Sequence, residues 1–174
     1  MKITFKKLSI PTPEIVSTLN KWGNDPALIP VIRPNFSKEA FERRDEITEE
    51  ALLKRLKYTQ IYLVYLDEKL VGEISFQVTP KQLYLRISGS AWIGINIGEA
   101  SARGKGVGVK AMQYLEDEIR AKGIKRIELG VFEYNAPAIR LYKKMGYEEI
   151  GRIPEFTYWD GKMWTDIRME KWLD

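Results

Sequence analysis

The chain has 174 residues, 44% of them hydrophobic, and a formal net charge of +4. This length suffices for one sizeable hydrophobic core, so we expect a single domain over residues 1–174. The sequence contains neither cysteine nor histidine, which excludes disulfide scaffolds, Ser-His-Asp triads, cysteine nucleophiles and zinc sites of the usual Cys/His kind.

The first third of the chain predicts one strand and two helices. Residues 1–9 alternate apolar and polar side chains, which is typical of a strand. Thr12 as N-cap and Pro13 at the first helical position predict a helix that begins there. Three prolines between residues 23 and 37 predict a loop, and the composition of residues 37–58 predicts one helix.

The middle of the chain is rich in β-forming residues. Residues 60–78 contain two such runs, and the Asp67-Glu68-Lys69 segment between them predicts a hairpin. Residues 83–97 continue with strand-like residues. From Gly104 to Lys122 the apolar residues recur at helical spacing, so a helix is predicted there.

The last third predicts a strand over residues 124–132, a short helix over 135–146 capped by Asn135, and two strands around the turn Asp160-Gly161. The predicted order is therefore strand, two helices, three strands, helix, strand, helix, two strands. This order indicates the α/β class, with a mixed twisted sheet flanked by helices.

Residues 101–108, SARGKGVG, place three glycines and two cations just before the predicted helix. Backbone amides at a helix start lack partners within the helix and can converge on an anion such as a phosphate. The glycines let the phosphate approach the backbone, and Arg103 and Lys105 add charge at the rim. The alternative is a solvent-exposed glycine turn with incidental cations.

Two common phosphate-binding patterns do not fit this loop. The P-loop needs four residues between its first glycine and a Gly-Lys pair, whereas five residues separate Gly98 from Gly104. The dinucleotide pattern G-x-G-x-x-G, started at Gly104, places Val109 where its last glycine belongs.

A third pattern, [QR]-x-x-G-x-[GA], is matched by Arg103, Gly106 and Gly108, and the loop resembles the acyl-CoA pyrophosphate loop of the GNAT superfamily of N-acetyltransferases. The stretch NAPAIRLYKKMGYEEIG is similar to the downstream signature of that superfamily, with Asn135 seven residues before Tyr142. The predicted order of elements also matches the GNAT acyl-CoA N-acyltransferase fold. Within the superfamily, IGEASARGKGVG and DGKMWTDIRME most resemble the ribosomal-protein N-terminal acetyltransferase-like group and its small-molecule-modifying relatives.

The resemblance implies that acetyl-CoA is the co-substrate and lies where the strand ending at Ile97 splays from the strand ending near Val131. Backbone groups of the first strand would pair with the pantetheine arm, and the loop amides would bind the pyrophosphate. The implied cofactor-binding residues are Ile95, Ile97, Arg103, Gly104, Lys105, Gly106, Val107, Gly108, Asn135 and Tyr142.

Two side chains of the downstream signature are expected at the cofactor. Asn135 would cap the helix and contact acetyl-CoA, although capping alone explains it equally well. Tyr142 lies where the family places a tyrosine near the thioester sulfur, and its hydroxyl could protonate the leaving thiolate. The alternative for Tyr142 is a core tyrosine packed beside Leu141 and Met145.

The general base is the least determined role. The acceptor amine must be neutral to attack, so a carboxylate or a water chain has to take its proton. The N-terminal acetyltransferases that the chain resembles often carry a Glu five residues before the motif Asn, but Gly130 stands there. Glu73 is the first candidate and Glu99 the second, and either could instead be a surface residue.

The expected reaction is direct acetyl transfer to a primary amine of a small molecule or of a protein N-terminus, because no cysteine can hold an acetyl intermediate. A non-catalytic acyl-CoA sensor or regulatory module is the alternative, which Gly130 keeps open. Candidate lining residues of the acceptor opening are Trp22, Arg33, Phe36, Tyr158, Trp159 and Trp164.

No stretch approaches the roughly 20 apolar residues of a membrane span, and the segment MKITFKKLSI lacks the features of a signal peptide. We therefore expect a cytoplasmic protein without a membrane partner. No nucleic-acid motif accompanies the net charge, so a nucleic-acid partner is not expected. No metal is predicted, although a magnesium site built from carboxylates alone stays open, as does a homodimer.

Overall fold

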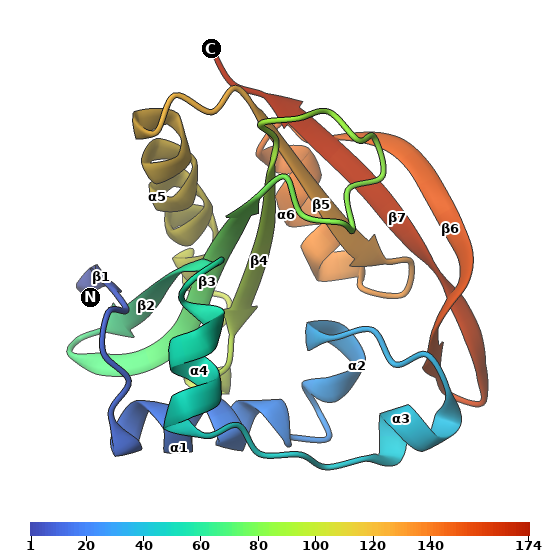
Figure 1. Ribbon diagram of the computed structural model, residues 1–174. Coiled ribbons are helices and arrows are strands. Elements are labelled where there is room, and N and C mark those ends of the chain that lie inside the picture. The colour runs from blue at the N-terminus through green and yellow to red at the C-terminus, as the bar shows by residue number, and fades with distance from the viewer.

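A computed structural model describes residues 1–174 and contains one seven-stranded sheet in the order β1-β2-β3-β4-β5-β7-β6 (Figure 1). The strands are β1 (Ile3–Lys7), β2 (Gln60–Leu66), β3 (Lys69–Val78), β4 (Ala91–Ile97), β5 (Arg126–Phe132), β6 (Glu148–Trp159) and β7 (Lys162–Trp172). Neighbouring strands are antiparallel except β4 and β5, which are parallel. The predicted mixed α/β architecture is confirmed.

The helices divide between the two faces of the sheet (Figure 1). They are α1 (Pro13–Gly23), α2 (Ile29–Ile32), α3 (Lys38–Glu42), α4 (Glu49–Arg55), α5 (Val107–Ala121) and α6 (Ala136–Lys144), with a short 3₁₀ turn at Ala100–Ala102. Side chains of α5 and α6 join the larger apolar core, and those of α1 and α4 join a smaller one against β2. No helix has the length and apolar character needed to cross a membrane.

The N-terminal helical region is more broken than predicted. The single helix expected over residues 37–58 is wrong, because α3 ends at Glu42 and Thr48 caps a separate helix by accepting a hydrogen bond from Ala51 N at 3.0 Å. Between them, the backbone of Ile47 is bound on both sides by the Asn20 side chain, at 2.8 and 2.9 Å. These tertiary contacts hold the intervening segment extended against α1.

Two further expectations need correction. The loop predicted over residues 23–37 contains the short helix α2, because its proline, Pro30, lies in the first turn where no amide donor is needed. The strand-like residues 83–90 form no strand, since β4 begins only at Ala91. That segment lies across the β5–β7 side of the sheet, where Glu128 accepts hydrogen bonds from the amides of Tyr84 and Leu85.

The local turn and cap signals are confirmed. The β2–β3 hairpin turns at Asp67 and Glu68, both with positive φ, and β6–β7 turns at Asp160-Gly161. Thr12 caps α1, and Asn135 caps α6 by accepting a hydrogen bond from Ala138 N at 3.4 Å. These short-range signals depend on a few neighbouring residues, which is why they could be identified in the sequence.

The sheet opens at its centre. β4 and β5 are paired only at Ala91–Ile127 and Trp92–Glu128, although both strands run several residues further. From Ile93 to Ile97, β4 is paired with β3 alone. The predicted splay between these two strands is therefore confirmed, and it leaves one edge of β4 without a neighbouring strand.

The end of β4 is held by a close contact that can be tested. A Cβ on Gly98 would overlap the ring of Trp22, which is buried and donates a hydrogen bond to Glu99 at 3.1 Å. We expect Gly98→Ala to lower the free energy of unfolding by about 1–3 kcal/mol, because the indole must shift to admit a methyl group. Urea denaturation measures the change.

Gly23→Ala is the matched control, since nothing lies within 4 Å of a Cβ at Gly23. Its unfolding free energy should stay close to that of the unmodified chain. Equal stabilities of the two variants would show that Trp22 does not fix the end of β4.

Candidate functional site

The gap between β4 and β5 opens into a cavity of about 740 Å³. Its walls come from residues 27–36, the free part of β4, the loop 102–108, the end of β5, α6, and parts of β6 and β7. The cavity therefore brings together segments from most of the chain, including both stretches that carry the sequence motifs. A cavity of this kind can bind a ligand that is anionic at the glycine loop and extends along the rest of the wall.

The glycine loop forms one end of the cavity. Gly104 and Gly106 have φ values of +71° and +77°, and Gly106 is the N-cap of α5 without a side-chain hydrogen bond to the first turn. The first amides of this 15-residue helix consequently have no partner in the helix. Since the N-cap glycine supplies no capping side chain, this end of the cavity suits an anion approaching the backbone.

The two cations of the loop lie differently. Arg103 lines the cavity, and its guanidinium donates to the carbonyls of Ile97 and Gly98 at 3.2 and 3.3 Å. Lys105 is exposed and does not line the cavity. Among the implied cofactor-binding residues, Lys105 alone lies outside the lining; Ile95, Ile97, Gly104, Gly106, Val107, Gly108, Asn135 and Tyr142 all belong to it.

Tyr142 reaches the cavity from α6. It is 7% exposed, and its ring meets that of Tyr147 edge to face with 6.0 Å between centroids. Burial raises the pKa of Tyr142 above its usual value. The hydroxyl therefore stays protonated over the physiological range and can serve as a proton donor but not as a base.

Neither predicted base lies on the cavity wall. Glu99 accepts hydrogen bonds from Trp22 and Lys21, and these bonds lower the pKa of its carboxyl despite some desolvation. Glu99 thus ties the end of β4 to α1, and the geometry does not support it as a base. Glu73 lies on β3, opposite Leu63 and Asn96, with Oε2 buried and unpartnered; burial raises its pKa.

Asp166 is a site residue that sequence reasoning missed. It lies on β7, is 2% exposed and is the only carboxylate on the cavity wall. Its Oδ2 accepts a hydrogen bond from Arg168 Nε at 2.8 Å, whereas Oδ1 is buried and has no partner. Burial raises the pKa of Asp166, and Arg168 opposes that shift. The alternation in TDIRME indicates a strand, but it does not tell which strands pair with it or on which side of the sheet Asp166 lies.

The proposed acceptor-lining residues divide in two. Arg33 and Phe36 line the cavity, and Arg33 Nε is buried without a hydrogen-bond partner. Trp22, Tyr158, Trp159 and Trp164 do not line it. Trp22 belongs to the smaller core, and Trp159 and Trp164 pack with Tyr134 beside the hairpin.

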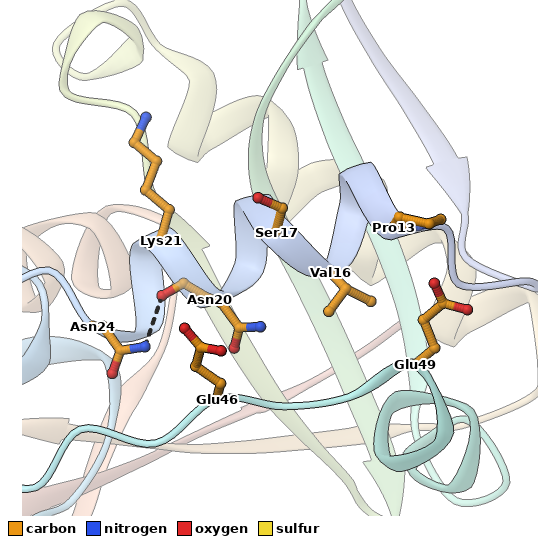
Figure 2. Close-up of a pocket in the computed structure, with 8 residues that line it drawn as sticks. All are labelled: Pro13, Val16, Ser17, Asn20, Lys21, Asn24, Glu46 and Glu49. Atoms are coloured by element: carbon orange, nitrogen blue, oxygen red, sulfur yellow. Dashed lines mark hydrogen bonds between the residues drawn. The ribbon is translucent and has the colours of Figure 1, made fainter.

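A second cavity of about 590 Å³ lies between α1 and the segment that leads into α4 (Figure 2). Figure 2 shows Asn20 and Val16 facing Glu46 and Glu49, with a hydrogen bond from Asn24 to the Asn20 carbonyl. It shares no lining residue with the larger cavity and contains none of the motif residues. The larger cavity is therefore the candidate site.

Comparison with known proteins connects this geometry to a family. The model of the acetyltransferase (GNAT) family matches residues 26–147. The spermine/spermidine N(1)-acetyltransferase of Bacillus subtilis (strain 168) is 29% identical over 101 residues, which are 58% of this chain and 66% of that protein. In six curated relatives that it matches, the aligned part of the chain spans less than two thirds of the relative's length.

Solved structures share the fold over nearly the whole chain. The ribosomal-protein-alanine N-acetyltransferase from Brucella melitensis is 18% identical, with a TM-score of 0.75 over 98% of this chain and 99% of that one. The spermidine N-acetyltransferase from Vibrio cholerae, in complex with CoA and spermine, is 18% identical, with a TM-score of 0.73 over 98% of this chain and 95% of that one. Members with different acceptors match equally well, so the comparisons do not single out the ribosomal-protein group.

The glycine loop gives a prediction about CoA binding. Gly106→Val should raise the dissociation constant for CoA at least about tenfold, because a β-branched residue disfavours the left-handed backbone that presents the amides of α5. Calorimetry on the folded variant measures this constant.

Gly161→Val provides the matched control, since Gly161 has a φ of +81° and open space around it but lies in the β6–β7 hairpin. It should cost stability without changing CoA affinity. A folded Gly106→Val variant that binds CoA as tightly as the parent chain would remove this loop from the site.

Proposed function

Since the chain belongs to the acetyltransferase (GNAT) family, we propose that it transfers an acetyl group from acetyl-CoA to a primary amine of a small molecule or of a protein N-terminus. The observation that carries this proposal is the continuous cavity in the β4–β5 gap. It extends from the glycine loop to Tyr142 and on to the buried Asp166. The glycine loop for an anion, Tyr142 as proton donor and the Asp166 carboxylate thus line one cavity.

The cofactor half of the cavity accounts for acetyl-CoA. The pyrophosphate would lie against the amides between Arg103 and Gly108, with the positive end of the α5 dipole behind it. The pantetheine arm would pair with the free edge of β4 at Ile95 and Ile97 in place of the missing strand. Asn135 would contact the cofactor from the start of α6. A CoA complex of a structural neighbour supports this co-substrate.

The positions of the cofactor and Tyr142 define the steps of acetyl transfer. The amine nitrogen attacks the thioester carbonyl, the C–N bond forms, and the C–S bond breaks to release CoA. Tyr142 would donate its proton to the departing sulfur, because burial keeps its hydroxyl protonated. No acetylated side chain is needed, and the chain has no cysteine to carry one.

The acceptor would enter from the side of residues 27–36. Phe36, Trp92 and Phe156 line this part of the cavity and Arg33 adds a cation. Apolar walls with the Arg33 cation, beside the Arg168–Asp166 ion pair, accommodate the aliphatic part of an amine and an anionic or polar end. Because two relatives are named for spermine and spermidine, small amines should be tested first.

Release of CoA across an amine panel tests the proposal. The panel should contain polyamines, amino acids with their decarboxylated counterparts, and N-terminal peptides, so that the contribution of an anionic group is separated from that of the amine. We expect saturable turnover of at least one amine, with product mass increased by one acetyl group. Tight acetyl-CoA binding without turnover of any amine would favour the alternative, a non-catalytic acyl-CoA sensor or regulatory module.

Tyr142→Phe tests the proton donor. We expect kcat to fall by about 10- to 1000-fold, because thiolate is a fair leaving group even without protonation. The dissociation constant for acetyl-CoA should stay near that of the parent chain, since the hydroxyl matters most as charge develops on sulfur.

Tyr147→Phe is the control for this measurement. Tyr147 is equally buried, but its hydroxyl donates to Glu116 at 2.8 Å and does not line the cavity. Its loss should cost stability and leave kcat unchanged. Full kcat in Tyr142→Phe, under conditions where chemistry limits the rate, would show that water or the substrate supplies the proton.

A further inference from the structure

Gly130 leaves β5 without a side chain at the cavity wall, and the space above it is filled from the neighbouring strand. A Cβ on Gly130 would lie 2.7 Å from Oδ2 of Asp166. A side chain at position 130 and the Asp166 carboxylate therefore exclude each other. The carboxylate in this part of the cavity is therefore supplied by β7 and not by β5.

One oxygen of the Asp166 carboxylate is hydrogen-bonded, and the other is buried without a partner. Arg168 binds Oδ2, and its own Nη1 donates to the carbonyl of Gln82 at 2.6 Å. The guanidinium is further held between Trp92 and Phe156, at 4.8 and 5.5 Å from the ring centroids. Oδ1 is left as a buried acceptor without a partner. A buried acceptor of this kind is unfavourable unless a ligand or water donates a hydrogen bond to it.

The charged and titratable groups around Asp166 are few. Arg168 contacts it directly, Glu128 on β5 lies 3.8 Å from Arg168, Tyr134 follows β5, and Arg33 lines the same cavity. Burial raises the pKa of Asp166 in spite of Arg168, which brings its basicity closer to the working pH. Glu99, by contrast, has a lowered pKa and contacts only residues outside the cavity.

We propose that Asp166 is the general base, taking the role that Gly130 cannot fill, and that Oδ1 accepts the proton of the acceptor amine. As nitrogen attacks the thioester carbon, its N–H proton passes to the carboxylate, the C–S electron pair leaves on sulfur, and Tyr142 protonates that sulfur. Asp166 then releases its proton to water and Tyr142 takes one up from water, so both side chains return to their starting state. The products are the acetamide and CoA, and no redox partner is needed. This inference rests on the proposed function.

The test compares Asp166→Asn with the parent chain over a range of pH, using the amine that the panel identifies. Asn keeps the shape and still accepts from Arg168, but it cannot take a proton. We expect kcat/KM to fall about 100- to 10,000-fold at neutral pH. The ionisation of Asp166 should disappear from the acid limb of the pH profile, which leaves only the increase of kcat/KM that follows deprotonation of the amine. Acetyl-CoA affinity should remain within about threefold, which also reports a folded protein.

A relocation variant separates basicity from structure. In Asp166→Ala the carboxylate is lost, and in Asp166→Ala/Gly130→Glu a carboxylate returns to the same space from β5. The double variant should recover at least about tenfold of the kcat/KM lost by the single variant. Because a Cβ at position 130 lies 3.3 Å from Arg168 Nε, a glutamate there can also pair with Arg168. A merely structural role for Asp166 would therefore restore stability in the double variant without restoring an ionisation in the pH profile of kcat/KM.

The outcomes distinguish the two proposals. If no amine is acetylated by the parent chain, the proposed function fails and this inference fails with it. If amines are acetylated and Asp166→Asn keeps its rate and acid limb, or if Glu73→Gln shows the loss instead, only the role of Asp166 is overturned. Should Asp166→Asn not fold, carbon-13 NMR of the parent chain decides, because the titration of Asp166 must coincide with the acid limb of kcat/KM.

Discussion

The short pairing of β4 with β5 is the feature on which the rest of the site depends. Two residue pairs join these parallel strands before they part, and every other pair of neighbouring strands is held over a longer stretch. A strand edge exposed inside a protein needs hydrogen-bond partners. The free edge of β4 is therefore incomplete without a ligand or water, and the cavity lies where that partner would be.

The point of divergence is held by buried charge. Glu128, the last β5 residue paired with β4, is fully buried and binds the Arg126 guanidinium at 2.8 Å as well as two amides of the segment 83–90. Arg126 is bound in turn by Glu170 and Ser90. Buried ion pairs add little net stability over an apolar core, but breaking one leaves an uncompensated charge. The main effect of this network is therefore to determine where β4 and β5 separate, and its contribution to the stability of the sheet is small.

The sequence predicted those parts of the site that depend on local chemistry. The glycine loop, the cap Asn135 and Tyr142 are specified by neighbouring residues, and all three lie on the cavity wall. The base candidates could not be placed in the same way. Glu73 lies on the strand next to β4, and Glu99 follows the end of β4. Their surroundings are set by segments distant in the sequence, α1 and β3 for Glu99 and α4 for Glu73. The breaks in the N-terminal helices likewise come from tertiary contacts such as Asn20 with Ile47.

The position of Asp166 follows from the register between two strands. Gly130 lies opposite Arg168 in the β5–β7 ladder, and Asp166 is the next residue on the same face of β7. Diagonal neighbours of this kind are close enough for side chains to meet, and a glycine removes the side chain that would separate them. A slip of one residue in this register would turn Asp166 to the opposite face of the sheet. That Gly130 and Asp166 belong to one site can be seen only once the β5–β7 register is known. In the sequence, each of them looks like an ordinary strand residue.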